Sequence, residues 1–140
     1  MNPLLQWLGA IPASLRSPLA IILGAIPGAL ARYYATVFLA KIFGNDLPYA
    51  TFLVNFSGCV GMGLVVTLAT QPALVSPDLR LLLAVGFLGS YTTFSTYALE
   101  VTSLWRTGQL AEGILYGLGS LVIGMIGVLL GNLIAQRFTI

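Results

Sequence analysis

The chain has 140 residues, of which 58% are hydrophobic and only 7% are charged, whereas soluble domains carry about a quarter charged residues to cover their surface. Six basic and four acidic residues give a net charge of +2, which is too small and too dispersed for a nucleic-acid-binding surface. With no histidine and a single cysteine, the chain lacks the ligands of a His/Cys zinc or haem site and the imidazole base of most hydrolytic mechanisms. The composition indicates a membrane protein, with no nucleic acid as partner and no support for an enzyme.

The apolar stretches divide the chain into four predicted spans. Because one span needs about 20 residues, 140 residues allow four spans with short connections. We interpret residues 1–17 as an interfacial segment rather than a signal peptide, because its positive charge, Arg16, follows the apolar stretch instead of preceding it. The prediction is a single all-α transmembrane domain over residues 1–140, with spans at about 18–40, 49–70, 78–105 and 110–136.

Turn-forming residues separate these spans. Gly44 and Pro48 mark the first connection, and Gly108 marks the third. The second contains Pro77, after which Asp78 is predicted to cap the third span.

Basic residues are nearly balanced between the two ends of the predicted bundle. Arg16, Arg80 and Arg137 fall on the side of the chain termini, and Lys41 and Arg106 fall on the other side. Because an excess of Lys and Arg normally fixes orientation, this balance favours insertion in both orientations. An antiparallel two-fold homodimer would follow, and a single topology is the alternative.

The third span is interrupted near its middle. Gly86, Gly89 and the polar residues 90–93 weaken a helix where the bilayer is thickest, and irregular backbone survives there only when it is buried in protein or faces water. An unwound segment would release carbonyls that can ligate a cation, and the next half-helix would point N–H groups at an anion. A plain packed kink is the alternative.

Polar side chains occur inside the spans at helical spacing. Thr93, Tyr97 and Glu100 share one face of the third span, and a carboxylate in lipid marks a pathway or proton site unless it reaches the interface. Thr51 and Asn55 lie one turn apart on the second span, either as an interhelical tie or as the lining of a polar path.

Two further features concern the outer spans. The first span contains Arg32 and no acid, which favours an anion path over a cation path. The fourth span contains small residues spaced as a heptad seam, which predicts close packing against another helix. The members of this seam are Gly113, Gly117, Ser120, Gly124, Gly127 and Gly131.

Three motifs resemble those of a known family. They are GALARY at residues 28–33, TFLVNFSG at residues 51–58 and GFLGSYTTFSTY at residues 86–97. On these motifs the chain resembles the CrcB family of Fluc-type fluoride channels from Leu19 to about Arg137. The resemblance implies a multi-pass protein of the cell membrane, an antiparallel homodimer in the lipid bilayer with two narrow pores that pass fluoride and reject chloride.

The resemblance also implies roles for individual residues. A structural Na⁺ at the dimer centre would be held by the main-chain carbonyls of Gly89 and Thr92. Tyr97 stands where the family usually has phenylalanine, which adds a hydroxyl at the ring edge. The implied fluoride path comprises the rings of Phe94 and Tyr97, the amide of Asn55, Tyr116 of the fourth span, the further polar positions Thr51, Thr93, Ser95, Thr96 and Glu100, and Arg32 at a vestibule.

The resemblance therefore predicts a passive channel that exports fluoride and lowers its cytoplasmic concentration. The alternative is a proton-coupled exporter of the small multidrug-resistance type. In that case Glu100 would be the membrane carboxylate that carries the proton.

Overall fold

The computed structural model describes residues 12–44, 47–71 and 73–138. These residues form helices and connections with no strand, so the all-helical prediction is confirmed. The long helices are α2 (Ala13–Phe43), α3 (Tyr49–Leu68) and α7 (Leu110–Gln136). Between α3 and α7 the chain forms a broken run of α4 (Pro77–Arg80), the π-helix η1 (Leu81–Leu88), α5 (Gly89–Tyr91) and α6 (Phe94–Arg106).

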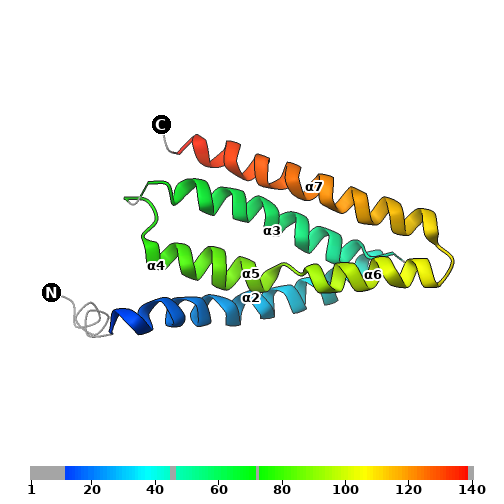
Figure 1. Cartoon of the computed structure of the whole chain (residues 1–140), viewed down its shortest axis with the longest axis horizontal. Helices are drawn as coiled ribbons and strands as arrows, with labels where there is room; N and C mark the ends of the chain where they lie inside the picture. The colour runs from blue at the N-terminus through cyan, green and yellow to red at the C-terminus, as the bar shows by residue number, and fades with distance from the viewer. Residues whose placement is uncertain (1–11, 45–46, 72, 139–140) are drawn as a thin grey trace.

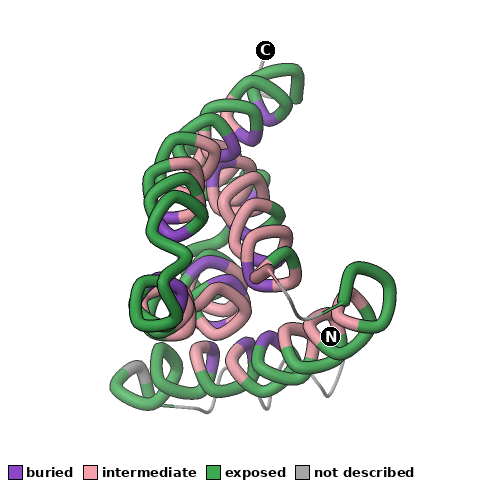
Figure 2. The backbone as a smooth tube through the Cα atoms, turned by 90° about the vertical axis from the view of Figure 1, so that its right-hand side faces the viewer, coloured by how far each residue is buried: buried purple, intermediate pink, exposed green. Residues whose placement is uncertain are grey.

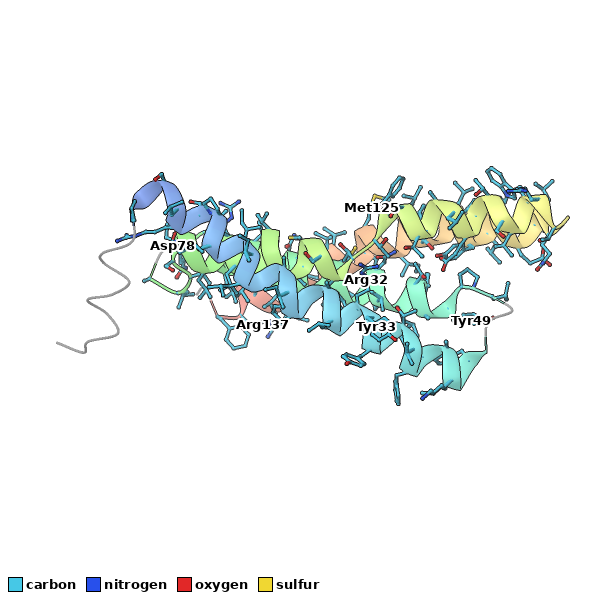
Figure 3. The ribbon with its side chains drawn as sticks, turned by 90° about the horizontal axis from the view of Figure 1, so that it is seen from below. Arg32, Tyr33, Tyr49, Asp78, Met125 and Arg137 are labelled. Atoms are coloured by element: carbon cyan, nitrogen blue, oxygen red, sulfur yellow. The ribbon has the colours of Figure 1, made fainter. Side chains whose placement is uncertain are left out.

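Successive segments run in alternating directions along the long axis of the molecule (Figure 1). The start of α2 and the end of α7 therefore lie at the same end, and Figure 3 shows Asp78 and Arg137 at this end and Tyr49 at the other. Helix α2 extends past the predicted span 18–40 at both ends and includes residues 13–17 of the predicted interfacial segment. Residues 1–11 of that segment lie outside the described residues.

The outer surface of the bundle is apolar. In the described part of the chain, three helices are long and apolar enough to cross a membrane, namely α2 from Ser14, α3 and α7. Large hydrophobic side chains point outward, such as Leu23 of α2 at 61% exposure and Leu115 of α7 at 75%, while buried residues face inward (Figure 2). Because soluble monomers rarely expose continuous apolar faces of this kind, the protein is a membrane protein.

The predicted seam on α7 packs against two different helices. Gly113 and Gly117 are buried against α6, where Trp105 and Val101 lie. Gly127 and Gly131 are buried against α3, and a Cβ at Gly131 would collide with the main-chain carbonyl of Val60 on α3. The backbones of α3 and α7 therefore approach to a distance that only glycine permits, and the predicted packing role is confirmed.

Close backbone contact also joins α2 to η1. A Cβ at Gly28 of α2 would collide with the Phe87 carbonyl, and one at Gly86 of η1 would lie 2.5 Å from the Ile21 carbonyl oxygen. No pattern in the sequence predicts the π-helical turns of η1. Such turns are rare and are frequent at functional sites, and η1 leads directly into the interruption of the run.

The start of this run corrects one prediction. Ser76, and not Asp78, is the N-cap residue of α4, and its hydroxyl accepts a hydrogen bond from the Leu79 amide at 3.3 Å. Pro77 occupies the first helical position, where its missing N–H is tolerated. The cap therefore falls on the residue before the proline, and Asp78 lies inside the first turn.

Candidate functional site

The helical run breaks at Thr92 and Thr93. Both residues have extended backbone, with φ/ψ of −80°/156° and −146°/114°, a conformation that suits β-branched side chains. The Thr93 hydroxyl caps α6 by accepting from the Thr96 amide at 3.3 Å, and it donates to Thr96 Oγ1 at 3.0 Å. The predicted interruption is confirmed, and the structure places it at these two threonines.

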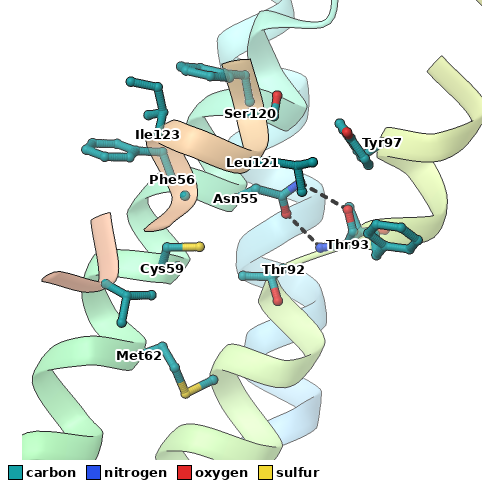
Figure 4. Close-up of a pocket in the computed structure, with 15 residues that line it drawn as sticks. Asn55, Phe56, Cys59, Met62, Thr92, Thr93, Tyr97, Ser120, Leu121 and Ile123 are labelled. Carbon is teal, nitrogen blue, oxygen red and sulfur yellow. Dashed lines mark hydrogen bonds between the residues drawn. The ribbon is translucent and has the colours of Figure 1, made fainter. Parts of the chain in front are cut away.

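Asn55 of α3 holds the break through its side-chain amide. Its Oδ1 accepts from the Thr93 N–H at 2.8 Å, and its Nδ2 donates to the Thr93 carbonyl at 3.0 Å (Figure 4). In an uninterrupted helix the Thr93 N–H would instead donate to the Gly89 carbonyl. Asn55 therefore replaces a helical hydrogen bond, and its role as an interhelical tie is observed directly.

Arg32 of α2 contacts the same region from another helix. Its Nε donates to the carbonyl of Ser90, two residues before Thr92, at 3.1 Å. The residue that the resemblance assigns to a vestibule thus lies beside the break. The break is held by an arginine from α2 and an asparagine from α3.

Three aromatic rings follow one another from the break toward α7. The centroids of Phe94 and Tyr97 are 5.5 Å apart, and those of Tyr97 and Tyr116 are 5.4 Å apart. Phe94 is 74% exposed, whereas the other two rings are partly buried. The Tyr97 hydroxyl donates to the main-chain carbonyl of Gly117 on α7 at 2.8 Å.

Glu100 joins three helices one turn further along α6. Its Oε1 accepts from the hydroxyl of Thr51 on α3 at 2.6 Å, and its Oε2 accepts from the hydroxyl of Tyr116 on α7 at 2.7 Å. Both distances are typical of hydrogen bonds to a charged carboxylate. The sequence interval predicted a shared face for Glu100 and Tyr97, and the structure adds partners from α3 and α7.

Two cavities lie along this line of residues. The first, of about 270 Å³, lies between α3, α7 and the break (Figure 4). The second, of about 290 Å³, opens where α2 and α6 end and α3 begins, and its lining includes Thr51, Glu100, Ser103 and Thr107. Asn55 of the first cavity and Thr51 of the second are one helical turn apart on α3. The lining of the first cavity includes the predicted path residues Asn55, Thr93, Phe94 and Tyr97, together with Thr92 and Ser120.

Some cavity-lining residues were not predicted from the sequence as part of the site, and the predicted path residue Ser95 lines neither cavity. Ser120 was predicted only as a small residue of the seam, yet among the described residues its Oγ is buried without a hydrogen-bond partner and lines the first cavity. Its hydroxyl was the available sequence signal. Ser103 and Thr107 of the second cavity were also missed, although both are hydroxyl residues close to Glu100 in sequence. Ser95 is exposed and lies 3.4 Å from the Thr93 hydroxyl.

The carbonyls of Gly89 and Thr92 fit a monovalent cation. In a continuous helix they would accept from the amides of Thr93 and Thr96, four residues further on. Here the Thr93 amide donates to Asn55, and the Thr96 amide donates to the Thr93 hydroxyl. Both carbonyls lose their helical donors, and unwound backbone carbonyls are the ligands that membrane proteins use for Na⁺.

An amide, hydroxyls and aromatic rings along cavities inside an apolar helical bundle are groups of the kind that line ion pathways in membrane proteins. Residues 19–132 match the family described as CrcB-like protein, Camphor Resistance (CrcB). A Synechocystis protein named Fluoride-specific ion channel FluC is 88% identical over 130 residues, which are 93% of this chain and 100% of the relative. Relatives of the same name from Synechococcus and Trichormus variabilis are 49% and 44% identical, over 90% and 88% of this chain and 97% and 90% of their own length.

The chain belongs to the CrcB family, as its motifs predicted. Members of this family are ion channels and not enzymes. The match decides against the alternative of a small multidrug-resistance exporter.

Proposed function

We propose that this chain is a fluoride-specific channel that passively exports fluoride and lowers its cytoplasmic concentration. The names of its relatives support this proposal. The observation that carries it is the cavity that Asn55, Phe94 and Tyr97 line together. Thr51, one turn from Asn55 on α3, lines the second cavity.

These groups suit a small, strongly hydrated anion. Fluoride gives up its water only where protein groups replace many contacts at once, and N–H and O–H donors and the electropositive edges of aromatic rings can do so. Ser120 adds a hydroxyl with no partner in the protein to the same cavity. Arg32 beside the break adds a positive charge that favours anions.

We infer that the broken run from Pro77 to Arg106 also crosses the membrane, as the third of four spans. At about 1.5 Å per residue, its helical parts are long enough together to cross the hydrocarbon core. The alternating directions of the segments support this inference, because two passes precede the run and α7 follows it (Figure 1). The break would then lie near the centre of the bilayer, as the resemblance implies.

We infer that two copies form an antiparallel homodimer. Phe94 belongs to the proposed path, yet 74% of it is exposed in one copy, so a second copy is needed to enclose the path. The nearly equal numbers of basic residues at the two ends support insertion in both orientations.

A structural Na⁺ at the centre of this dimer fits the released carbonyls of Gly89 and Thr92. When bound, it would neutralise the carbonyl dipoles of the break in both subunits. Since the proposed role is removal of fluoride from the cytoplasm, the membrane concerned is the cell membrane.

The test is fluoride release from liposomes that contain the purified protein, measured with a fluoride electrode against a matched chloride load. We expect rapid release of fluoride and none of chloride. Phe94→Ile should abolish the release or reduce it sharply, because it removes the most exposed ring of the path. The matched control is Phe38→Ile on α2, a phenylalanine of similar exposure, 62%, that lines neither cavity.

The wild-type result tests the proposed function, and the Phe94→Ile result tests the proposed path. Absence of fluoride release from folded, dimeric wild-type protein contradicts the proposed function. Undiminished release by Phe94→Ile removes this ring from the path but leaves the channel itself intact.

A further inference from the structure

The hydroxyl of Tyr97 is committed to a partner within the protein. A phenol has one O–H hydrogen to donate, and here it lies on the Gly117 carbonyl of α7 at 2.8 Å. That carbonyl also lies within α7, and a carbonyl oxygen can accept two hydrogen bonds. The tie therefore leaves the helical hydrogen bonding of α7 undisturbed.

This commitment limits what Tyr97 can offer to an anion. Fluoride is a hydrogen-bond acceptor and requires a donor. With its only hydrogen on Gly117, the phenol presents just an oxygen with a partial negative charge, which would repel the ion. What remains for the ion is the ring, whose edge carries partial positive charge.

The neighbours of Tyr97 fix the position of that ring. It lies between Phe94 and Tyr116, with centroid distances of 5.5 and 5.4 Å and interplanar angles of 45° and 59°. The hydroxyl tie at the far end of the ring determines its direction, and the packing on its two sides restricts its rotation. A phenylalanine would retain the packing and lose the tie.

We propose that Tyr97 is a positioning residue of the proposed fluoride path. Its hydroxyl ties α6 to the Gly117 carbonyl of α7, and this tie holds the ring, which alone faces the ion, between Phe94 and Tyr116. This inference rests on the proposed function and specifies which part of one side chain serves it. The hydroxyl that a tyrosine has and a phenylalanine lacks thus has a partner on α7.

The test compares two variants that separate ring from hydroxyl. Tyr97→Phe keeps the ring and removes the tie, and Tyr97→Leu removes both. We expect Tyr97→Phe to release fluoride within about threefold of the wild-type rate and to exclude chloride, whereas a hydroxyl that donated to the ion would cost about tenfold or more. Tyr97→Leu should lose fluoride release, so that flux is preserved only by the conservative variant.

Thermal unfolding of the detergent-solubilised protein tests the tie itself. Tyr97→Phe should unfold a few degrees lower than the wild type because one interhelical hydrogen bond is lost. The control is Tyr34→Phe on α2, a tyrosine that is 64% exposed, which should leave the unfolding temperature and the flux unchanged.

Three outcomes overturn the proposal. One is a large loss of fluoride release in a folded Tyr97→Phe dimer, which would make the hydroxyl an ion contact. Another is full release by Tyr97→Leu, which would remove the ring from the path, and the third is an unchanged unfolding temperature for Tyr97→Phe. Each of these presupposes active wild-type protein, whereas an inactive wild type would refute the proposed function itself.

Discussion

Asn55→Asp is the most direct test of the amide at the break. The substitution keeps an oxygen that can accept from the Thr93 N–H, but it removes the donor to the Thr93 carbonyl and adds a negative charge. Because Asn55 lines the first cavity, that charge would face any anion that passes. We expect a folded protein that no longer releases fluoride.

The size of the effect follows from the charge and from the lost bond. Two unit charges about 4 Å apart at an effective dielectric constant of about 20 repel each other by about 4 kcal/mol, which corresponds to about a thousandfold in rate. Losing one interhelical hydrogen bond in a membrane costs about 0.6–1.5 kcal/mol of stability. Burial of the new carboxylate adds to that cost, so flux is compared between preparations that remain folded and dimeric.

The assay is fluoride release from liposomes, with thermal unfolding of the same preparation. Asn132→Asp on α7 is the matched control, because Asn132 accepts through Oδ1 from the Thr67 hydroxyl at 2.9 Å and lines neither cavity. Its carboxylate can still accept that bond. Full release by Asn55→Asp would make Asn55 an interhelical tie and nothing more, and an equal loss in Asn132→Asp would refute the argument from position.

Two further predictions concern packing and coupling. Gly131→Val should destabilise the protein by about 1–3 kcal/mol, because its side chain would collide with the Val60 carbonyl of α3; thermal unfolding measures this, and Gly119→Val, whose Cβ meets nothing within 4 Å, should be much milder. Fluoride release should be equal with and without an imposed proton gradient in both the wild type and Glu100→Gln. Release that needs the gradient in the wild type and loses that need in Glu100→Gln would contradict a passive channel and restore coupling through Glu100.

Local patterns in the sequence were sufficient to predict the long helices and the break, but not the π-helical turns of η1. Apolar stretches of the right length gave α3 and α7 closely, and glycines followed by Thr92 and Thr93 gave the interruption, because these are properties of neighbouring residues. The seam of small residues was recognised for the same reason. Its two partners, α6 and then α3, depend on the arrangement of whole helices, which spacing along one helix does not specify.

The site was predicted in composition but not in its contacts. Helical spacing placed Tyr97 and Glu100 on one face, yet the Tyr97 hydroxyl bonds to a carbonyl 20 residues away and Glu100 bonds to Thr51 49 residues away. Arg32 donates to the main-chain carbonyl of Ser90. A partner of this kind has no sequence signature, because every residue has a carbonyl. Long-range pairing therefore marks the limit of inference from this sequence.

A break in a helix is commonly a point of bending, and here the surrounding side chains oppose that motion. Arg32 hydrogen-bonds to the Ser90 carbonyl before the break, and Asn55 hydrogen-bonds to both the N–H and the carbonyl of Thr93. Arg32 holds the α5 side of the break and Asn55 holds the α6 side, so α6 cannot swing relative to α5 without breaking the bonds on one side. These bonds favour a fixed break over a hinge. A protein built in this way would keep the residues of the proposed pathway in place on both sides of the break without a bending step in this segment.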